Sequence, residues 1–79
     1  MERAPSDIDA RGLRCPMPVL KMEAALRRLP CGAKVRVTAD DPIAAVDIPH
    51  FARAGGHSCE RLDAAEGVCV FLVTRGEKP

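Results

Sequence analysis

Large aromatic side chains are nearly absent from this chain. It has no Trp, no Tyr and only two Phe among 79 residues, so it lacks the stacking surfaces with which proteins bind single-stranded nucleic acid. A net charge of +1 gives no general attraction to nucleic acid or to an acidic membrane. No run of about 18 apolar residues and no apolar signal segment is present. We therefore expect a cytoplasmic protein with no membrane partner and no direct nucleic-acid partner.

The four cysteines form no recognisable metal or disulfide pattern. Cys15, Cys31, Cys59 and Cys69 include no Cys-x-x-Cys pair, and their spacing fits no zinc template. Thiols also stay reduced in the cytoplasm, which argues against a disulfide framework. Because a chain of 79 residues buries only a thin core, any chemistry should lie at the surface and be completed by a partner. We expect no cofactor and no metal.

Alternating and helical patterns of apolar residues predict the order β-α-β-α-β-β. The first βαβ unit should be right-handed and parallel, which gives a four-stranded mixed sheet with both helices on one face. This is a two-layer α/β sandwich of the α+β class, formed by a single domain, 1–79, with flexible tails at 1–6 and 76–79. Strands are expected at 7–10, 34–39, 57–63 and 68–74, and helices at 16–29 and 43–54.

The apolar faces of the two predicted helices are not equally easy to assign from the sequence. In the second, Ile43, Val46 and His50 share one face. Pro49 would cost about 3 kcal/mol inside a helix, so we expect the helix to restart there, with Asp47 as the new N-cap. The face of the first helix is expected to comprise Val19, Met22, Leu26 and Leu29, widened by Leu20 and Ala25.

The other face of the sheet should be open to solvent. The alternation of the strand at 34–39 assigns Lys34, Arg36 and Thr38 to that face. The strand at 68–74 is almost continuously apolar, so Cys69 is expected in the core.

The segment Cys15-Pro16-Met17-Pro18 begins the first helix and is the most informative feature of the chain. Proline is tolerated in the first turn, where backbone N–H groups have no partner within the helix. The two prolines therefore fix where the helix begins, with Cys15 at or beside its N-cap. We expect Arg14, Pro16, Met17 and Pro18 to shape a site around the Cys15 thiol.

Charge near Cys15 is expected to favour its ionised form. The N-terminus of a helix carries a partial positive charge, and Arg11, Arg14 and Lys21 lie close in sequence. The thiolate is the form that attacks sulfur. Cys15 is therefore the candidate catalytic nucleophile.

Other polar residues give weaker signals. His50 and His57 are not tied to Cys15 by local sequence, and the aspartates at 40, 41 and 47 are typical of turns and caps. Two alternatives to sulfur chemistry stay open. Cys15 could be an inert cap in a regulatory or interaction module. A thiol–disulfide reductase would need a resolving cysteine, and Cys31 lies at the other end of the helix, roughly 20 Å away.

Several blocks of the chain resemble the TusA/SirA-like sulfur carriers, and the TusA branch most closely. They follow one another in the order and spacing of that family and span nearly the whole chain. The blocks are Asp9-Ala10-Arg11-Gly12-Leu13-Arg14-Cys15-Pro16-Met17-Pro18-Val19, Asp40-Asp41-Pro42, Asp47-Ile48-Pro49-His50-Phe51 and Gly56-His57.

The resemblance implies a two-layer sandwich and a sulfur-relay function. In that family the motif cysteine, here Cys15, accepts a sulfane sulfur as a persulfide from a cysteine desulfurase or another donor. It then passes the sulfur to an acceptor protein, for example for thiolation of the wobble uridine of tRNA. Such a protein is a carrier with sulfurtransferase-like exchange chemistry, not a stand-alone enzyme.

One residue departs from the family pattern. Met17 stands between the prolines, where the carriers that serve tRNA thiolation usually have Glu. Related carriers serve sulfur oxidation, molybdenum cofactor or selenium pathways, so the sequence leaves the pathway open.

Overall fold

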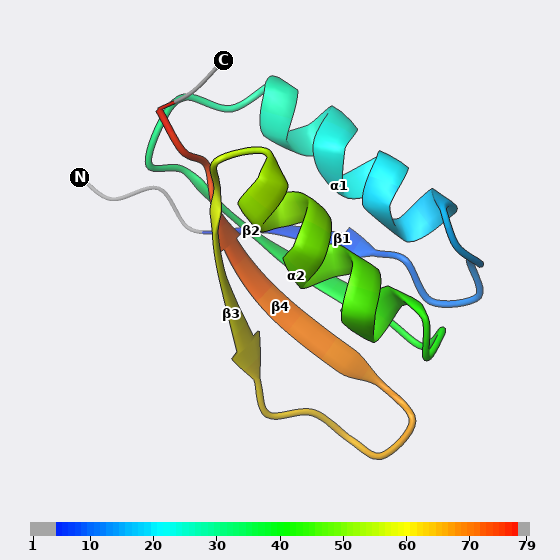
Figure 1. Cartoon of the computed structure of the whole chain (residues 1–79). Helices are drawn as coiled ribbons and strands as arrows, with labels where there is room; N and C mark the ends of the chain where they lie inside the picture. The colour runs from blue at the N-terminus through cyan, green and yellow to red at the C-terminus, as the bar shows by residue number, and fades with distance from the viewer. Residues whose placement is uncertain (1–4, 78–79) are drawn as a thin grey trace.

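The computed structural model describes residues 5–77 and has the predicted order of elements (Figure 1). Ser6, assigned to an N-terminal tail from sequence, instead begins the first strand; the tail residues 1–4 and 78–79 lie outside the described residues. No helix within residues 5–77 is long and apolar enough to cross a membrane. The elements are β1 (Ser6–Asp9), α1 (Met17–Arg27), β2 (Lys34–Ala39), α2 (Ala44–Ala54), β3 (Ser58–Leu62) and β4 (Cys69–Thr74).

The four strands form one mixed sheet in the order β1-β2-β4-β3. β1 pairs with β2 in parallel, while β4 pairs antiparallel with both β2 and β3. Figure 1 shows both helices on the same face of the sheet, which confirms the predicted two-layer architecture. Because β1 and β2 are parallel, the loops that follow them leave the sheet at the same edge. This edge brings the Cys15 loop next to the loop that begins at Asp40.

The core lies between the sheet and the two helices. β2 alternates as predicted, so Val35, Val37 and Ala39 are fully buried beneath the helices. Lys34 and Arg36 are exposed on the open face, and Arg36 bonds to the Asp7 carboxylate at 2.7 Å.

The apolar face of α1 is narrower than predicted. Val19, Met22 and Leu26 are buried, and Ala25 and Leu29 pack partly against the core. Leu20 does not widen this face and is exposed. It follows Val19 by one residue, which is about 100° around the helix, and so it turns away from the sheet.

The second helix differs from prediction in two ways. It runs from Ala44 to Ala54 without a restart, and Pro49 lies inside it. Ile48 and Ala52, on either side of Pro49, are both fully buried, so packing against the sheet holds the two parts in one helix despite the local cost of proline. The face predicted from Ile43 and Val46 is the exposed one.

Candidate functional site

Cys15 lies in the loop between β1 and α1, two residues before the helix begins. Pro16 is the N-cap and makes no side-chain cap hydrogen bond, which confirms that Cys15 lies beside the N-cap. Cys15, Arg14 and Pro16 are exposed, and Met17 is 49% exposed. Pro18 is fully buried and anchors the first turn of α1 to the core. The motif therefore presents Cys15 and Met17 to solvent from a fixed base.

Two aspartates after β2 hold this loop in place. Asp40 Oδ1 accepts a hydrogen bond from the Gly12 backbone N–H at 2.9 Å. Asp41 Oδ2 accepts one from the Cys15 N–H at 2.9 Å, and Asp41 Oδ1 accepts one from the Ile43 N–H at 3.2 Å. Asp41 is only 5% exposed, so its carboxylate joins the backbone of Cys15 to the start of α2 from a protected position. Cys15 is thus anchored through its own main chain.

The Cys15 thiol itself contacts a third carboxylate. Cys15 Sγ donates a hydrogen bond to Asp47 Oδ2 over 2.7 Å. Asp47 lies inside α2, so it is a partner of the thiol and not the helix cap that the sequence predicted. The hydrogen bond to Asp47 raises the pKa of Cys15, and partial desolvation and the charges of Asp47 and Asp41 raise it further. The predicted stabilisation of the thiolate is therefore wrong for the isolated protein.

Two of the basic residues expected to favour the thiolate are held at Asp9. Arg11 binds both oxygens of the Asp9 carboxylate, at 2.8 Å and 2.9 Å. Lys21 Nζ donates to the Asp9 carbonyl oxygen at 3.0 Å. Arg11 also holds the pKa of the Asp9 carboxyl well below its usual range. The charges that shift the pKa of Cys15 are those of Asp47 in α2 and Asp41 in the loop before it.

The sequence carried a signal for one of these carboxylates but not for the other. Asp40 and Asp41 follow β2, and parallel pairing with β1 places them at the edge where Cys15 lies. The position of Asp47 depends on the rotation of α2 about its axis. Because the sequence assigned the wrong face of α2 to the core, it did not predict that Asp47 points toward Cys15. Its contact with Cys15 joins residues 32 positions apart.

The other cysteines occupy different environments. Cys31 is exposed in the loop after α1, at the opposite end of that helix from Cys15. Cys59 is half-buried against the core, and Cys69 is buried in β4 as predicted. Burial raises the pKa of both Cys59 and Cys69. Cys15 thus differs from Cys59 and Cys69 by its exposure and from Cys31 by its carboxylate partner.

The histidines do not form a catalytic arrangement with Cys15. His57 Nδ1 accepts a hydrogen bond from the Gly76 N–H at 2.9 Å, and His50 packs edge-on against Phe51. Among residues 5–77, no three side chains of the metal-binding types come together as a possible metal site. The chemistry of the site therefore rests on the thiol and its carboxylates.

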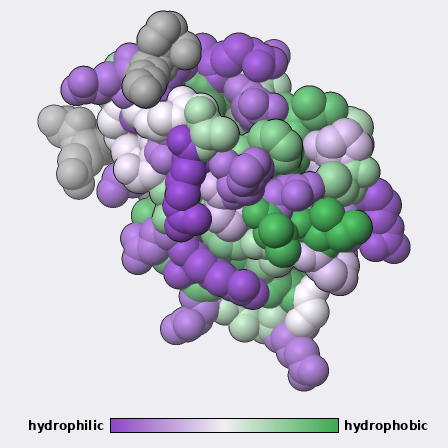
Figure 2. Space-filling view, in the orientation of Figure 1, coloured by the Kyte–Doolittle hydropathy of each residue, from purple (hydrophilic) through white to green (hydrophobic). Residues whose placement is uncertain are grey.

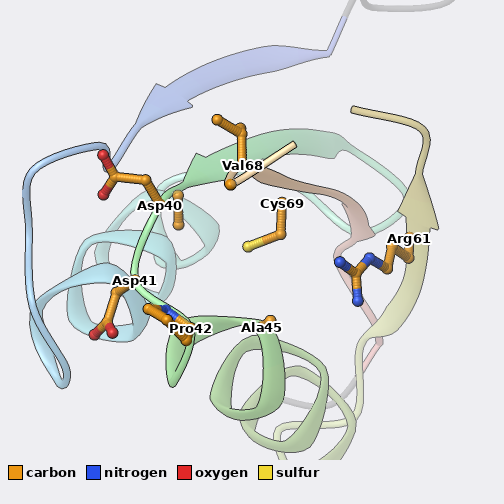
Figure 3. Close-up of a pocket in the computed structure, with 9 residues that line it drawn as sticks. Asp40, Asp41, Pro42, Ala45, Arg61, Val68 and Cys69 are labelled. Carbon is orange, nitrogen blue, oxygen red and sulfur yellow. The ribbon is translucent and has the colours of Figure 1, made fainter. Parts of the chain in front are cut away.

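A hollow of about 200 Å³ lies between the loop after β2, the start of α2 and the ends of β3 and β4 (Figure 3). The Cys69 sulfur points into it, and Arg61 lies across it from Asp40 and Asp41. Figure 3 shows the Asp41 carboxylate turned away from Arg61, which agrees with its hydrogen bond to Cys15. Cys15 does not line the hollow and is exposed at the surface.

Apolar side chains lie exposed on the outer side of both helices. Figure 2 shows hydrophobic surface gathered over α2 and the N-terminal part of α1. Exposed apolar patches on soluble proteins commonly mark interaction sites. We call this patch the helical apolar surface; its members are Met17, Leu20, Ile43, Val46 and Phe51.

These features define a class: small two-layer α/β proteins that carry an exposed, backbone-anchored thiol beside an apolar surface. A family model described as "Sulfurtransferase TusA" matches residues 6–75. The chain is 36% identical over 70 residues to "Sulfur carrier protein TusA" of Pseudomonas syringae pv. syringae (strain B728a), covering 89% of this chain and 83% of that protein. It therefore belongs to the TusA family.

The fold is shared with a solved structure. The crystal structure of a SirA-like protein from Desulfitobacterium hafniense superimposes with a TM-score of 0.80 at 33% identity. The match covers 90% of this chain and 97% of that one. The resemblance to the TusA/SirA-like carriers and the predicted α+β sandwich are both confirmed.

Proposed function

We propose that this protein is a sulfur carrier that accepts a sulfane sulfur as a persulfide on Cys15. The donor is a cysteine desulfurase or another persulfide-bearing protein, and the sulfur passes next to an acceptor protein. The single observation that carries the proposal is the geometry of Cys15. Its thiol is exposed at the start of α1, while its backbone is held by the protected Asp41 carboxylate. Membership of the TusA family supports the same function.

The reaction is an exchange between a thiol and a persulfide. Cys15 loses its proton, and the resulting thiolate attacks the outer sulfur of the donor persulfide. One S–S bond forms as the other breaks, and the donor leaves as a thiolate that takes up a proton. Cys15 now carries the outer sulfur, and an attacking acceptor thiolate removes it in the same way. The exchange is balanced without an external oxidant or reductant, so Cys15 needs no cofactor on this chain.

Partners would recognise the helical apolar surface that flanks the thiol. Met17, two residues from Cys15, is 49% exposed and would meet a docked partner directly. We propose tRNA 2-thiouridine modification or a related sulfur-trafficking pathway as the destination of the sulfur. Met17, in place of the usual Glu, would help decide between these pathways. The four free cysteines fit the reducing conditions of the cytoplasm, where we place the exchange.

Persulfide loading tests the proposal. The reduced protein is incubated with a cysteine desulfurase, pyridoxal phosphate and cysteine, and its intact mass is then measured. We expect a gain of one sulfur atom that reductant removes. Cys15→Ser should abolish the gain, whereas Cys59→Ser and Cys69→Ser should retain it. Loading that survives Cys15→Ser would disprove the assignment of Cys15.

A second candidate is a non-catalytic interaction module in which Cys15 has a structural role. The raised pKa of Cys15 and the helical apolar surface favour it, because an interaction module needs no populated thiolate. The two functions differ in loading, since only a carrier takes up sulfur from a donor. The third possibility, a thiol–disulfide reductase, lacks support because Cys31 lies at the far end of α1.

A further inference from the structure

The Asp47 carboxylate lies directly beside the reacting atom. Its Oδ2 is 2.7 Å from Cys15 Sγ, so any electrophile that approaches the sulfur also approaches this negative charge. Asp41 adds a second carboxylate, which lies at the Cys15 backbone N–H. Two neighbouring cations, Arg11 and Lys21, are bound at Asp9. An incoming donor therefore meets the negative field of the Asp47 carboxylate at the sulfur.

We propose that Asp47 is a specificity-determining residue, which favours sulfur donors that bring a positively charged group to the Cys15 thiol. The proposal rests on the sulfur-carrier function and adds the chemistry of the preferred donor. Such a donor would carry a Lys or Arg side chain beside its own persulfide.

The preference follows from the charge balance of the exchange. Cys15 must lose its proton before it attacks, and the adjacent carboxylate opposes the negative charge that this creates on sulfur. A cation placed against Asp47 offsets the carboxylate and stabilises the thiolate, so attack on the donor sulfur can proceed. A donor with a negative group is repelled and leaves the carboxylate uncompensated. In the isolated protein, the hydrogen bond to Asp47 favours the protonated thiol of Cys15.

Charged thiol reagents measure this field directly. Two methanethiosulfonates of similar size are used, one with a trimethylammonium group and one with a sulfonate group, and their rates at Cys15 are followed by peptide mass. Both react with the same thiolate, so the ratio of the rates is independent of its pKa. Removing one charge so close to the sulfur should lower the cation-to-anion ratio about tenfold in Asp47→Asn.

Matched variants separate a charge effect from a structural one. Asp47→Glu keeps the charge and should keep the high ratio. Glu60→Gln removes one negative charge from the open face of the sheet, away from the helices, and should leave the ratio unchanged. Cys31, exposed at the other end of α1, is an internal reference in each sample. The pH profile of Cys15 alkylation should also move to lower pH in Asp47→Asn only.

The rate at which charged persulfides load Cys15 tests whether the charge of Asp47 also affects sulfur transfer. We expect the persulfide of cysteamine to load Cys15 faster than the persulfide of 3-mercaptopropionate, and Asp47→Asn to remove most of this preference. Equal preferences in the wild type and Asp47→Asn, with Cys15 loaded in both, would overturn the role of Asp47 and leave the carrier function intact. If no donor loads Cys15 in the wild type, the carrier function fails and this proposal fails with it.

Discussion

Cys15 and Cys69 both have a raised pKa, but for different physical reasons. Cys69 is 5% exposed in the central strand β4, and burial disfavours its charged form. Cys15 is exposed, and the Asp47 carboxylate is the main cause of its shift. A partner can change the surroundings of Cys15 by docking, whereas those of Cys69 change only if the core opens. A raised pKa by itself therefore does not distinguish a buried thiol from an exposed one that contacts a carboxylate.

The surroundings of Cys15 and the core that contains Cys69 meet at two neighbouring residues of α2. Asp47 turns to the Cys15 thiol, and Ile48 turns into the core with no exposed surface. The core therefore fixes the orientation of the carboxylate through the residue next to it.

The core side of α2 should carry most of its stability. We expect Ile48→Ala to lower the free energy of unfolding by about 2–5 kcal/mol, because it leaves a cavity between α2 and the sheet. Val46, 69% exposed two residues earlier, provides the control, and Val46→Ala should change stability by less than about 0.5 kcal/mol. Urea unfolding measures both. Equal losses would mean that α2 does not pack on the sheet through Ile48.

The two thiols should respond differently to the same substitution. Cys69→Ser places a hydroxyl in the core and should cost about 1–3 kcal/mol of unfolding free energy. Cys15→Ser should cost less than about 0.5 kcal/mol, since the site is exposed and a hydroxyl can still donate to Asp47. Thermal or urea unfolding of the two variants tests the contrast. A larger loss for Cys15→Ser would indicate that Cys15 is a structural residue.

Alkaline pH should weaken the fold through the buried thiol. A pKa raised on folding contributes stability that is complete below the unfolded value, about 8.5, and is lost as pH rises through the folded value. We expect the unfolding free energy of the wild type to fall as the pH rises above about 8.5. Cys69→Ala, which cannot ionise there, should lose less. Parallel pH profiles for the two proteins would contradict the prediction.

Local sequence patterns were sufficient for most of the fold. Strict alternation from Lys34 to Ala39 predicted β2 with its observed bounds and faces. The prolines located the start of α1 because their chemistry acts within a single turn. The helix around Pro49 could not be predicted locally, because burial of Ile48 and Ala52 decides it. Tertiary packing there overrides the cost of one proline.

In the functional site, too, local sequence predicted some features, while others depend on tertiary contacts. Exposure of Cys15 beside the N-cap followed from its motif, and Pro18 in the first turn was expected. The ionisation of the thiol was predicted with the wrong sign, because Arg11 bonds to Asp9 and Asp47 reaches the sulfur from another helix. Nearness in sequence identified the cations but not the groups they bind.

Whether Cys15 is the residue that carries sulfur can be tested by comparing two exposed thiols in one sample. Cys15 and Cys31 are both exposed, but only Cys15 lies at the start of α1 beside a carboxylate. After incubation with a cysteine desulfurase and cysteine, peptide mapping measures the sulfur carried by each. We expect reductant-labile sulfur on Cys15 and little on Cys31. Equal labelling of the two thiols, or none on Cys15 with several donors, would show that Cys15 is not the sulfur-carrying residue.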